Sequence, residues 1–204
     1  MYKNPVIVFE GIEGSGKTYH LKCVSAHLKK QKIDFIKLRE PGGSKNSEKI
    51  RKLILNNKTN FNKNTDLLLY LAARSENIGI IKKNYNKKII LIDRFIDSTI
   101  AYQHYGLGVN LNILKTINDY LLMGLKVNFT FLNIVNQKNM KNRLNKRKNL
   151  NRYDKFKDSF YRKVQNGFLK IANKNKKKYL IVDSNQDVEL NKKIIIKKIN
   201  QLIK

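Results

Sequence analysis

The feature that most constrains the fold is a glycine-rich octet placed between two different hydrophobic patterns. Residues Gly11 to Thr18 read Gly-Ile-Glu-Gly-Ser-Gly-Lys-Thr and fit the pattern G-x-x-x-x-G-K-[ST] at every constrained position. A β-branched run, Val6 to Phe9, precedes the octet, and apolar residues at helical spacing follow it. These are Leu21, Val24 and Leu28, and a second apolar run, Ile33 to Leu38, comes next. The order predicts a strand, a glycine turn, a helix and a second strand.

This octet is typical of a loop that binds the phosphates of a nucleoside triphosphate. Its glycines allow backbone N–H groups to turn inward around phosphate oxygens, and the following helix adds its positive end. Lys17 is expected to reach the β- and γ-phosphates, and the Thr18 hydroxyl to ligate Mg²⁺. The alternative is a glycine turn that binds nothing. We predict triphosphate contacts by Gly11, Ile12, Glu13, Gly14, Ser15, Gly16, Lys17 and Thr18.

The remaining strands and helices alternate along the chain. In Lys88 to Asp93, four consecutive apolar residues precede a carboxylate, which indicates a strand buried on both faces with Asp93 at its C-terminal end. Ligand sites of open parallel sheets lie at that end. Further strands are predicted at Val127 to Leu132 and Tyr179 to Val182. The alternation predicts an α/β fold with a parallel sheet of about five strands flanked by helices.

Helices are predicted wherever apolar residues repeat at three- and four-residue intervals. The expected helices lie at Ile50 to Ile54, about Thr65 to Lys83, Leu114 to Leu121, Asn136 to Arg147, Phe160 to Ile171 and Ile195 to Leu202. No proline-rich or serine-rich linker divides the 204 residues, so we expect a single domain over residues 1–204.

Apolar runs and cysteine content predict a cytoplasmic protein without a membrane segment. Runs such as Leu67 to Ala73 are much shorter than the roughly 20 residues of a membrane helix, and the N-terminus runs into a strand rather than a signal peptide. The single cysteine, Cys23, is expected to be a small buried hydrophobe. The three histidines have no zinc-ligand spacing, so Mg²⁺ is the only metal expected.

The formal net charge of +28 has two interpretations. Lysines are scattered along nearly every amphipathic segment and mixed with asparagine and isoleucine, which favours a solvated surface over one nucleic-acid-binding stripe. We therefore expect no specific nucleic-acid partner, although non-specific adhesion to polyanions should occur at low salt. Because lysine is the background residue, the arginines are the more informative cations.

Three further segments resemble the thymidylate kinase family, and the likeness spans nearly the whole chain. They are Arg39-Glu40-Pro41-Gly42-Gly43-Ser44, the run from Asp93-Arg94-Phe95 to Ala101-Tyr102-Gln103, and Asn151-Arg152-Tyr153-Asp154 leading into Phe160-Tyr161-Arg162. The resemblance implies a P-loop kinase fold, ATP and Mg²⁺ as cofactors, and transfer of the γ-phosphate to dTMP. It also implies a homodimer.

The residues themselves fit such a reaction. A monophosphate acceptor attacks through an oxygen that is already anionic, so catalysis depends on positioning and charge neutralisation rather than on a strong general base. No histidine lies beside a candidate nucleophile, whereas arginines recur in expected loops. These are Arg39, Arg74, Arg94, Arg143, Arg147 and Arg152.

The resemblance implies specific roles at the acceptor site. Arg94 and Arg39 would hold the acceptor phosphate, Asp93 would lie near Mg²⁺, and Glu13 near the sugar 3'-hydroxyl. Tyr70 would stack on the base, Arg74 would reach thymine O4, Thr99 would reach N3, and Tyr102 would exclude a ribose 2'-hydroxyl. The remaining expected acceptor contacts are Glu40, Ser98 and Gln103. For Tyr70 the alternative is an ordinary place in the helix core.

Residues 143–154 resemble the basic lid of the family. The lid would close over ATP, with Arg143 on the nucleotide and Arg147 or Arg152 on the transferring phosphoryl group, because the glycine loop itself carries no arginine. A solvated basic loop is the alternative. Asn151 and Lys148 depart from the usual aspartate and glycine, which leaves lid motion open.

Three other functions compete with this hypothesis. The nearest is another P-loop nucleoside or nucleotide kinase with a different base preference. A regulatory GTP-binding switch is disfavoured because the chain has no Asn-Lys-x-Asp motif. A nucleic-acid-dependent ATPase is disfavoured because Asp93 is followed by Arg94 rather than by an acidic residue that would activate water.

Overall fold

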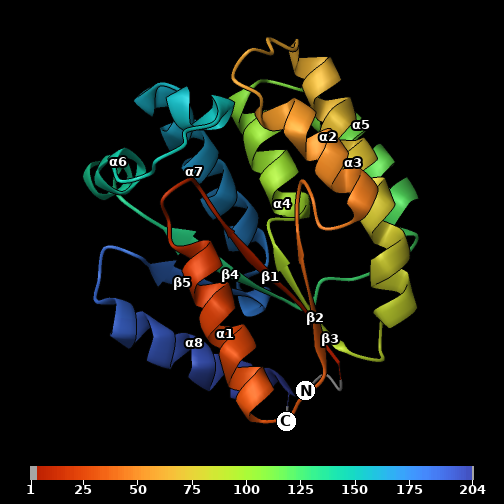
Figure 1. Ribbon diagram of the computed structural model, residues 1–204, viewed down its shortest axis with the longest axis vertical. Coiled ribbons are helices and arrows are strands. Elements are labelled where there is room, and N and C mark those ends of the chain that lie inside the picture. Colours follow the sequence, from red (N-terminus) through yellow and green to blue (C-terminus); the bar gives the residue numbers. More distant parts are fainter. Residues whose placement is uncertain (1–3, 204) are drawn as a thin grey trace.

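The computed structural model describes residues 4–203 as a five-stranded parallel sheet covered by helices on both faces (Figure 1). The strand order is β2-β3-β1-β4-β5. The strands are β1 (Val6–Gly11), β2 (Phe35–Arg39), β3 (Ile89–Asp93), β4 (Phe129–Ile134) and β5 (Tyr179–Asp183). The α/β class and the parallel sheet predicted from the sequence are confirmed.

Eight α-helices and three helical turns of other types accompany the strands in the described part of the chain. The α-helices are α1 (Lys17–Lys30), α2 (Lys45–Leu55), α3 (Lys63–Asn84), α4 (Ile96–Thr99), α5 (Leu111–Leu122), α6 (Gln137–Asn145), α7 (Asp158–Lys174) and α8 (Val188–Ile203). The other turns are the π-helix η1 (Ile100–Gly106) and the 3-10 helices η2 (Arg152–Lys155) and η3 (Lys176–Lys178).

Alternate residues of the central strands build the core on each face of the sheet. On one face Ile7 and Phe9 of β1 pack with α1 and α8, which lie side by side in Figure 1. On the other face Val6 and Val8 pack with Ile78 of α3 and with the end of α5. All four β1 residues are buried, as expected for the central strand of a parallel sheet.

The strands end together along one edge of the sheet. Gly11 at the end of β1 lies opposite Asn133 of β4, and Asp93 at the end of β3 lies opposite both Phe9 and Arg39. The glycine loop, the loop after β2 and the loop after β3 therefore begin within one small region. This edge positions the site described below.

A third core lies beyond that edge, where η1 packs against α7. A Cβ atom at Gly167 of α7 would lie 2.6 Å from the Tyr105 ring, so only glycine lets the two helices approach this closely. Three consecutive residues of η1, Ala101, Tyr102 and Gln103, are all buried. No element was predicted here from the sequence, because a π-helix lacks the ordinary helical spacing.

Some details differ from the sequence predictions, and β2, for example, starts at Phe35 rather than at Ile33. The fourth strand was expected at Val127 to Leu132, but β4 starts two residues later, because its pairing with β1 runs from Phe129 to Asn133. Cys23 is half-buried rather than buried, since it lies at the margin of the α1 face that contacts the sheet. Across residues 4–203, no helix has the length and apolar character needed to cross a membrane.

Candidate active site

The glycine loop between β1 and α1 is held in a conformation that requires glycine. A Cβ atom at Gly11 would lie 2.2 Å from the backbone oxygen of Asn133, which no side chain tolerates. Gly16 precedes α1 with a φ of 86°, in the left-handed region. The loop therefore curls over the N-terminus of α1, where backbone N–H groups and the helix dipole favour an anion.

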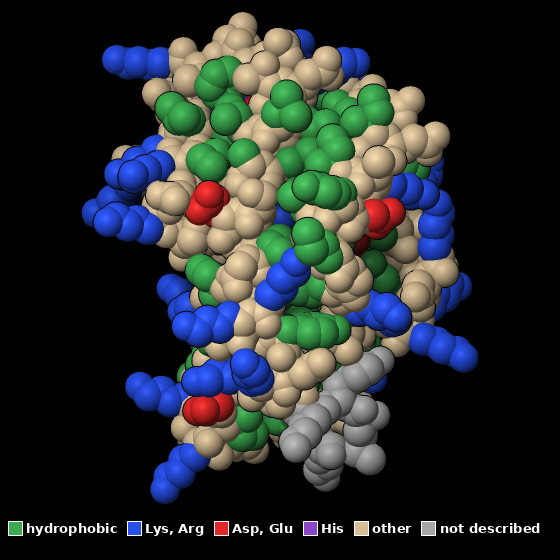
Figure 2. Space-filling view, turned by 90° about the vertical axis from the view of Figure 1, so that its right-hand side faces the viewer, with side chains coloured by type: hydrophobic (Ala, Val, Ile, Leu, Met, Phe, Trp, Pro, Cys, Tyr) green, Lys and Arg blue, Asp and Glu red, His purple; other side chains and the backbone are tan. Residues whose placement is uncertain are grey.

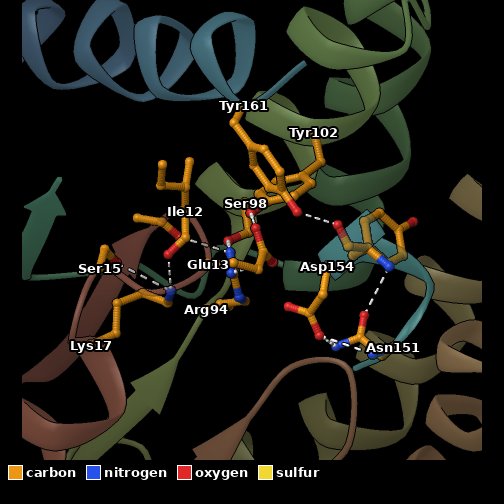
Figure 3. A network of polar contacts seen from close by, with 12 residues as sticks. Ile12, Glu13, Ser15, Lys17, Arg94, Ser98, Tyr102, Asn151, Asp154 and Tyr161 are labelled. Carbon is orange, nitrogen blue, oxygen red and sulfur yellow. Dashed lines mark hydrogen bonds and ion pairs between the residues drawn. The ribbon is translucent and has the colours of Figure 1, made fainter. Parts of the chain in front are cut away.

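Lys17 lies buried inside this loop. Its Nζ donates to the backbone oxygen of Ile12 at 2.7 Å and approaches Ser15 Oγ at 3.4 Å (Figure 3). Burial, followed by the nearby charge of Arg94, lowers the pKa of Lys17 from 10.5 to about 7. The Lys17 amine is thus shielded from solvent, and the oxygens that it contacts in the loop are neutral.

The next residue, Thr18, faces the carboxylate that ends β3. Thr18 Oγ1 donates to Asp93 Oδ2 at 2.7 Å, so a hydroxyl and a carboxylate oxygen lie within reach of one ion. Among residues 4–203 no group of three His, Cys, Asp or Glu residues could hold a metal by itself. This donor set suits Mg²⁺, which binds through one or two protein oxygens and substrate phosphates.

Arg94 and Glu13 join the glycine loop to the loop after β3. Arg94 Nη2 contacts Glu13 Oε1 at 2.8 Å, and Arg94 Nη1 donates to the backbone oxygen of Gly11 at 2.8 Å. The Tyr102 hydroxyl donates to the other Glu13 oxygen, and its ring lies 5.1 Å from the Arg94 guanidinium (Figure 3). The structure therefore brings these three predicted site residues together.

A buried carboxylate, Glu10, fixes the backbone that follows Arg94. Its Oε1 accepts from the N–H groups of Phe95 and Ser98, at 2.8 and 3.2 Å, and its Oε2 accepts from the Ser98 hydroxyl at 2.5 Å. Burial, together with the charge of Asp97, raises the pKa of Glu10 to about 7. Glu10 thus caps the start of α4 and holds Arg94 at a φ of 66°.

Aromatic and amide side chains form the far end of the site. The rings of Tyr70 and Tyr102 both pack edge-on against Tyr153, at centroid distances of 6.0 and 5.9 Å. Beside them, Gln103 is buried, and neither its Oε1 nor its Nε2 has a hydrogen-bond partner in the described part of the chain. An unpaired buried amide is costly, so this donor and acceptor pair marks a place for a polar ligand.

Arg74, one helical turn beyond Tyr70 on α3, is also buried. It forms an ion pair with Glu40 at 2.8 Å and donates to Thr99 Oγ1 at 2.8 Å. The sequence placed Arg74, Glu40 and Thr99 in the acceptor site, and the fold brings all three into contact.

Two further arginines flank the acceptor end. Arg39 pairs with Glu48 of α2 at 2.8 Å, and its side chain is about half exposed. Arg51 of α2 donates to the Pro41 carbonyl at 2.6 Å, and the Glu40–Pro41 bond is cis. Burial, followed by the charge of Arg39, lowers the pKa of Arg51, whereas the hydrogen bond to Glu48 raises the pKa of Arg39.

The three lid arginines occupy different places. Arg143 donates to the backbone oxygens of Gly14 and Ser184, at 2.9 and 2.6 Å, on the outer side of the glycine loop. Arg147 pairs with Asp154 at 2.8 Å. Arg152 instead turns to α3, where its Nη2 contacts Asp66.

One cleft of about 240 Å³ unites most of the predicted site. The predicted residues that line it are Glu13, Lys17, Thr18, Arg39, Glu40, Tyr70, Arg74, Asp93, Arg94, Ser98, Thr99, Tyr102, Gln103 and Arg147. Arg143 and Arg152 do not line it, and Gly11, Ile12, Gly14, Ser15 and Gly16 form the loop wall behind Lys17. A cationic loop thus faces a cationic, aromatic pocket across a single cleft.

Comparison with known proteins agrees with this arrangement. The family model for thymidylate kinase matches residues 9–195. The chain belongs to the thymidylate kinase family. It is accordingly a nucleoside monophosphate kinase, a phosphotransferase. The family resemblance seen in the sequence and the P-loop kinase fold are both confirmed.

Individual members of the family match along nearly their whole length. A thymidylate kinase of Sulfurihydrogenibium sp. is 38% identical over 96% of this chain and 96% of its own. One of Acholeplasma laidlawii is 36% identical over 93% of this chain and 96% of its own. The crystal structure of thymidylate kinase from Ehrlichia chaffeensis superposes with a TM-score of 0.77 at 30% identity, covering 97% and 98% of the two chains.

Some cleft residues of this thymidylate kinase family member were missed by the sequence analysis. Arg51 lies in a lysine-rich helix rather than in an expected loop, and Leu55 was assigned to no site. Tyr153 was quoted only as part of a family segment, although it lines the cleft between two other tyrosines. The rarity of arginine in this lysine-rich chain was the signal that could have identified Arg51.

Proposed function

We propose that this chain transfers the γ-phosphoryl group of ATP to dTMP, giving dTDP, within a single domain spanning residues 1–204. Family membership supports the reaction class. The observation that carries the proposal is that Lys17 and Arg94, one cation for each phosphate group, border the same cleft. An acceptor and a donor bound there could meet end to end, which is the geometry of in-line phosphoryl transfer.

On the donor side, the N–H groups at the start of α1 and Lys17 would bind the triphosphate, with Arg143 beside the loop. Thr18 and Asp93 would hold Mg²⁺, and that ion, when bound, neutralises charge on the β- and γ-phosphates. The pKa of Lys17, about 7 in the ligand-free protein, should rise once phosphate oxygens surround it. Lys17 would then act as a full cation during transfer.

On the acceptor side, Arg94 and Arg39 would bind the monophosphate, and Tyr70 would stack on the base. The unpaired amide of Gln103 and the guanidinium of Arg74 suit the carbonyl and N–H groups of a pyrimidine edge. Glu13 and Tyr102 form the wall facing the sugar. Glu40, Ser98 and Thr99 would support these contacts from behind, since each is bonded to Arg74, Arg94 or Glu10.

For the lid, residues 143–154, we favour Arg147 as the cation that contacts the transferring phosphoryl group. Arg147 borders the cleft, whereas Arg152 does not line it and turns toward Asp66 of α3. Asp154, fully buried, accepts from Arg147 and from the backbone N–H of Asn151, so it organises the lid in its present form. Arg152 would then anchor the lid rather than act on phosphate.

We also propose that the protein acts as a homodimer through the face formed by α2, α3 and α5. Figure 2 shows hydrophobic side chains gathered over the upper part of this face, with most lysines and arginines toward its edges. Its large exposed apolar residues are Leu53, Leu68, Ile113, Tyr120 and Met123. Such a patch is unusual on a lysine-rich monomer and suits a two-fold contact with a second copy. The cytoplasmic location and the absence of a specific nucleic-acid partner stay predictions.

An ADP-release assay tests the reaction. With Mg-ATP as donor, dTMP should support a higher kcat/KM than dUMP, UMP or thymidine, because Arg94 would bind the phosphate, Tyr70 would stack on the base and Tyr102 would exclude a 2'-hydroxyl. A stronger signal with any of the other three would assign a different kinase. ATP hydrolysis stimulated by DNA but not by dTMP would instead identify a nucleic-acid-dependent ATPase.

A further inference from the structure

The guanidinium of Arg74 is held from three sides. Nε donates to Glu40 Oε2 at 2.8 Å, Nη2 donates to Thr99 Oγ1 at 2.8 Å, and Nη1 donates to Asn118 Oδ1 at 2.5 Å. The partners come from the loop after β2, from α4 and from α5. Glu40 and Asn118 accept hydrogen bonds from opposite edges of the planar guanidinium, so together they prevent it from rotating.

Asn118 itself can be oriented in only one way. Its Oδ1 accepts from Arg74, and its Nδ2 donates to the backbone oxygen of Leu114 at 2.9 Å, four residues earlier on α5. A guanidinium only donates and a carbonyl oxygen only accepts, so a flipped amide would lose both bonds. The side chain is 3% exposed and lies outside the cleft lining. Asn118 thus ties Arg74 to the backbone of α5 without facing the ligand.

A count of donors shows what remains for a ligand. A guanidinium has five N–H groups. Nε–H serves Glu40, one Nη2–H serves Thr99 and one Nη1–H serves Asn118, while Nη2 also lies 2.8 Å from Glu40 Oε2 in the ion pair. One Nη1–H is left over among the contacts of the described residues, on a group that borders the cleft. Because both Nη1–H bonds lie in one plane at a fixed angle, the bond to Asn118 sets the direction of the free one.

We propose that Asn118 is a positioning residue for acceptor recognition, which aims the free Nη1–H of Arg74 at a carbonyl oxygen on the acceptor base. The inference rests on the proposed dTMP kinase function and extends it to a residue that never touches the acceptor. It assigns a ligand class as well: a pyrimidine with a carbonyl, rather than an amino group, at that edge.

The neutral amide suits this position better than the alternatives. Glu40 already neutralises Arg74 from the opposite edge, so an apolar residue at position 118 would leave a buried N–H without a partner and the guanidinium free to tilt. An aspartate would keep the acceptor oxygen, although it would lose the amide donor to Leu114. The two substitutions therefore separate loss of the hydrogen bond from loss of packing.

The test measures steady-state kinetics of Asn118→Leu and Asn118→Asp beside the wild-type enzyme. We expect Asn118→Leu to raise the KM for dTMP about tenfold, the effect of losing a hydrogen bond to a charged group, with the KM for ATP unchanged within twofold. Its preference for dTMP over dCMP should fall. Asn118→Asp should stay near the wild-type KM for dTMP. If Asn118→Leu does not fold, Asn118→Ser replaces it with the same expectation.

Asn84→Leu is the matched control. Asn84 on α3 also donates to the carbonyl four residues earlier, Ile80, at 2.9 Å, but within residues 4–203 no hydrogen bond or ion pair joins it to a cleft residue. Its KM for dTMP should match the wild type. A KM for dTMP within twofold of wild type in Asn118→Leu, or an equal rise in both KM values, would overturn the positioning role. A wild-type enzyme inactive on dTMP would instead reject the proposed function, whatever the variants do.

Discussion

The burial of Lys17 should make the binding of a triphosphate depend on pH. In the ligand-free loop its pKa is about 7, because burial and then Arg94 disfavour its charge. Below that pH the free enzyme already carries the proton, whereas above it the amine is largely neutral. A bound triphosphate favours the charged form, so binding above pH 7 must take up a proton.

We predict that ATP binding at pH 8 takes up nearly one proton and that the uptake disappears near pH 6. Calorimetry in two buffers of different ionisation enthalpy measures it. Lys17→Arg, whose guanidinium stays charged at both pH values, should show no uptake. Equal heats in both buffers at pH 8 for the wild type would contradict the shifted pKa.

At the residue scale, sequence reasoning found those side chains whose identity follows from local pattern. Lys17 and Thr18 start α1 and Asp93 ends β3, each in a recognisable motif, and the contact of Thr18 with Asp93 follows from parallel strands ending together. Asn118 could not be found in this way. It is an ordinary polar residue on an amphipathic helix, and its partner Arg74 lies 44 residues away.

At the scale of elements, residues 143–154 are not a solvated basic loop, because several of their side chains are bonded to the rest of the fold. Arg152 and the Tyr153 hydroxyl both contact Asp66 on α3, and Arg152 also lies over the Phe61 ring at 5.6 Å. Asn151, where the family usually has aspartate, caps η2 through the N–H of Tyr153 at 2.8 Å. The departure from the family pattern therefore retains the capping function.

The two candidate lid arginines should respond differently to removal. We predict that Arg147→Ala lowers kcat by about 10²–10³, because it removes a cation from the transfer site. It should cost less stability than Arg152→Ala, because Asp154 keeps the two hydrogen bonds that it accepts from Asn151. Arg152→Ala should instead destabilise the fold, by about 3 kcal/mol, since it leaves buried Asp66 unpaired. Thermal unfolding and single-turnover rates separate the two effects.

The double variant Arg152→Met with Asp66→Asn provides the control. Removing both charges should recover much of the stability lost in Arg152→Ala, as expected for a buried pair replaced by neutral groups. If Arg152→Ala lost as much kcat as Arg147→Ala while keeping the wild-type melting temperature, the roles of the two arginines would be reversed.

The elements themselves were largely predictable, with one instructive gap. Continuous apolar runs gave the strands to within two residues, because buried parallel strands leave little room for polar positions. The π-helical turn η1 could not be predicted, since it is fixed by its packing against Gly167 and Phe160 of α7 rather than by its own spacing. That turn carries Tyr102 and Gln103. Both residues were predicted for the acceptor pocket, whereas the turn that positions them was not.

For the whole molecule, the distribution of charge and apolar surface points to self-association. Leu68 on α3 is 59% exposed and Tyr120 on α5 is 71% exposed, on a protein of net charge +28. We predict a species of twice 23.9 kDa in sedimentation experiments. Leu68→Lys and Tyr120→Lys should each shift it toward monomer, because each places two added charges in one two-fold contact.

Leu190→Lys on α8, which is 47% exposed on a different helix, is the matched control and should leave the mass unchanged. A wild-type protein that sediments as a monomer at micromolar concentration would rule out the dimer. If only the Leu190→Lys variant dissociated, the contact would lie elsewhere.

Asp66, Tyr70 and Arg74 follow one another at four-residue intervals on α3, so they lie along one side of the same rod. The first contacts Arg152, and the second and third line the cleft. A substitution that slides or rolls α3 by a fraction of an ångström would disturb all three together. Substitutions beneath α3 that confer resistance to an inhibitor should therefore also lower activity, because this one helix positions all three side chains.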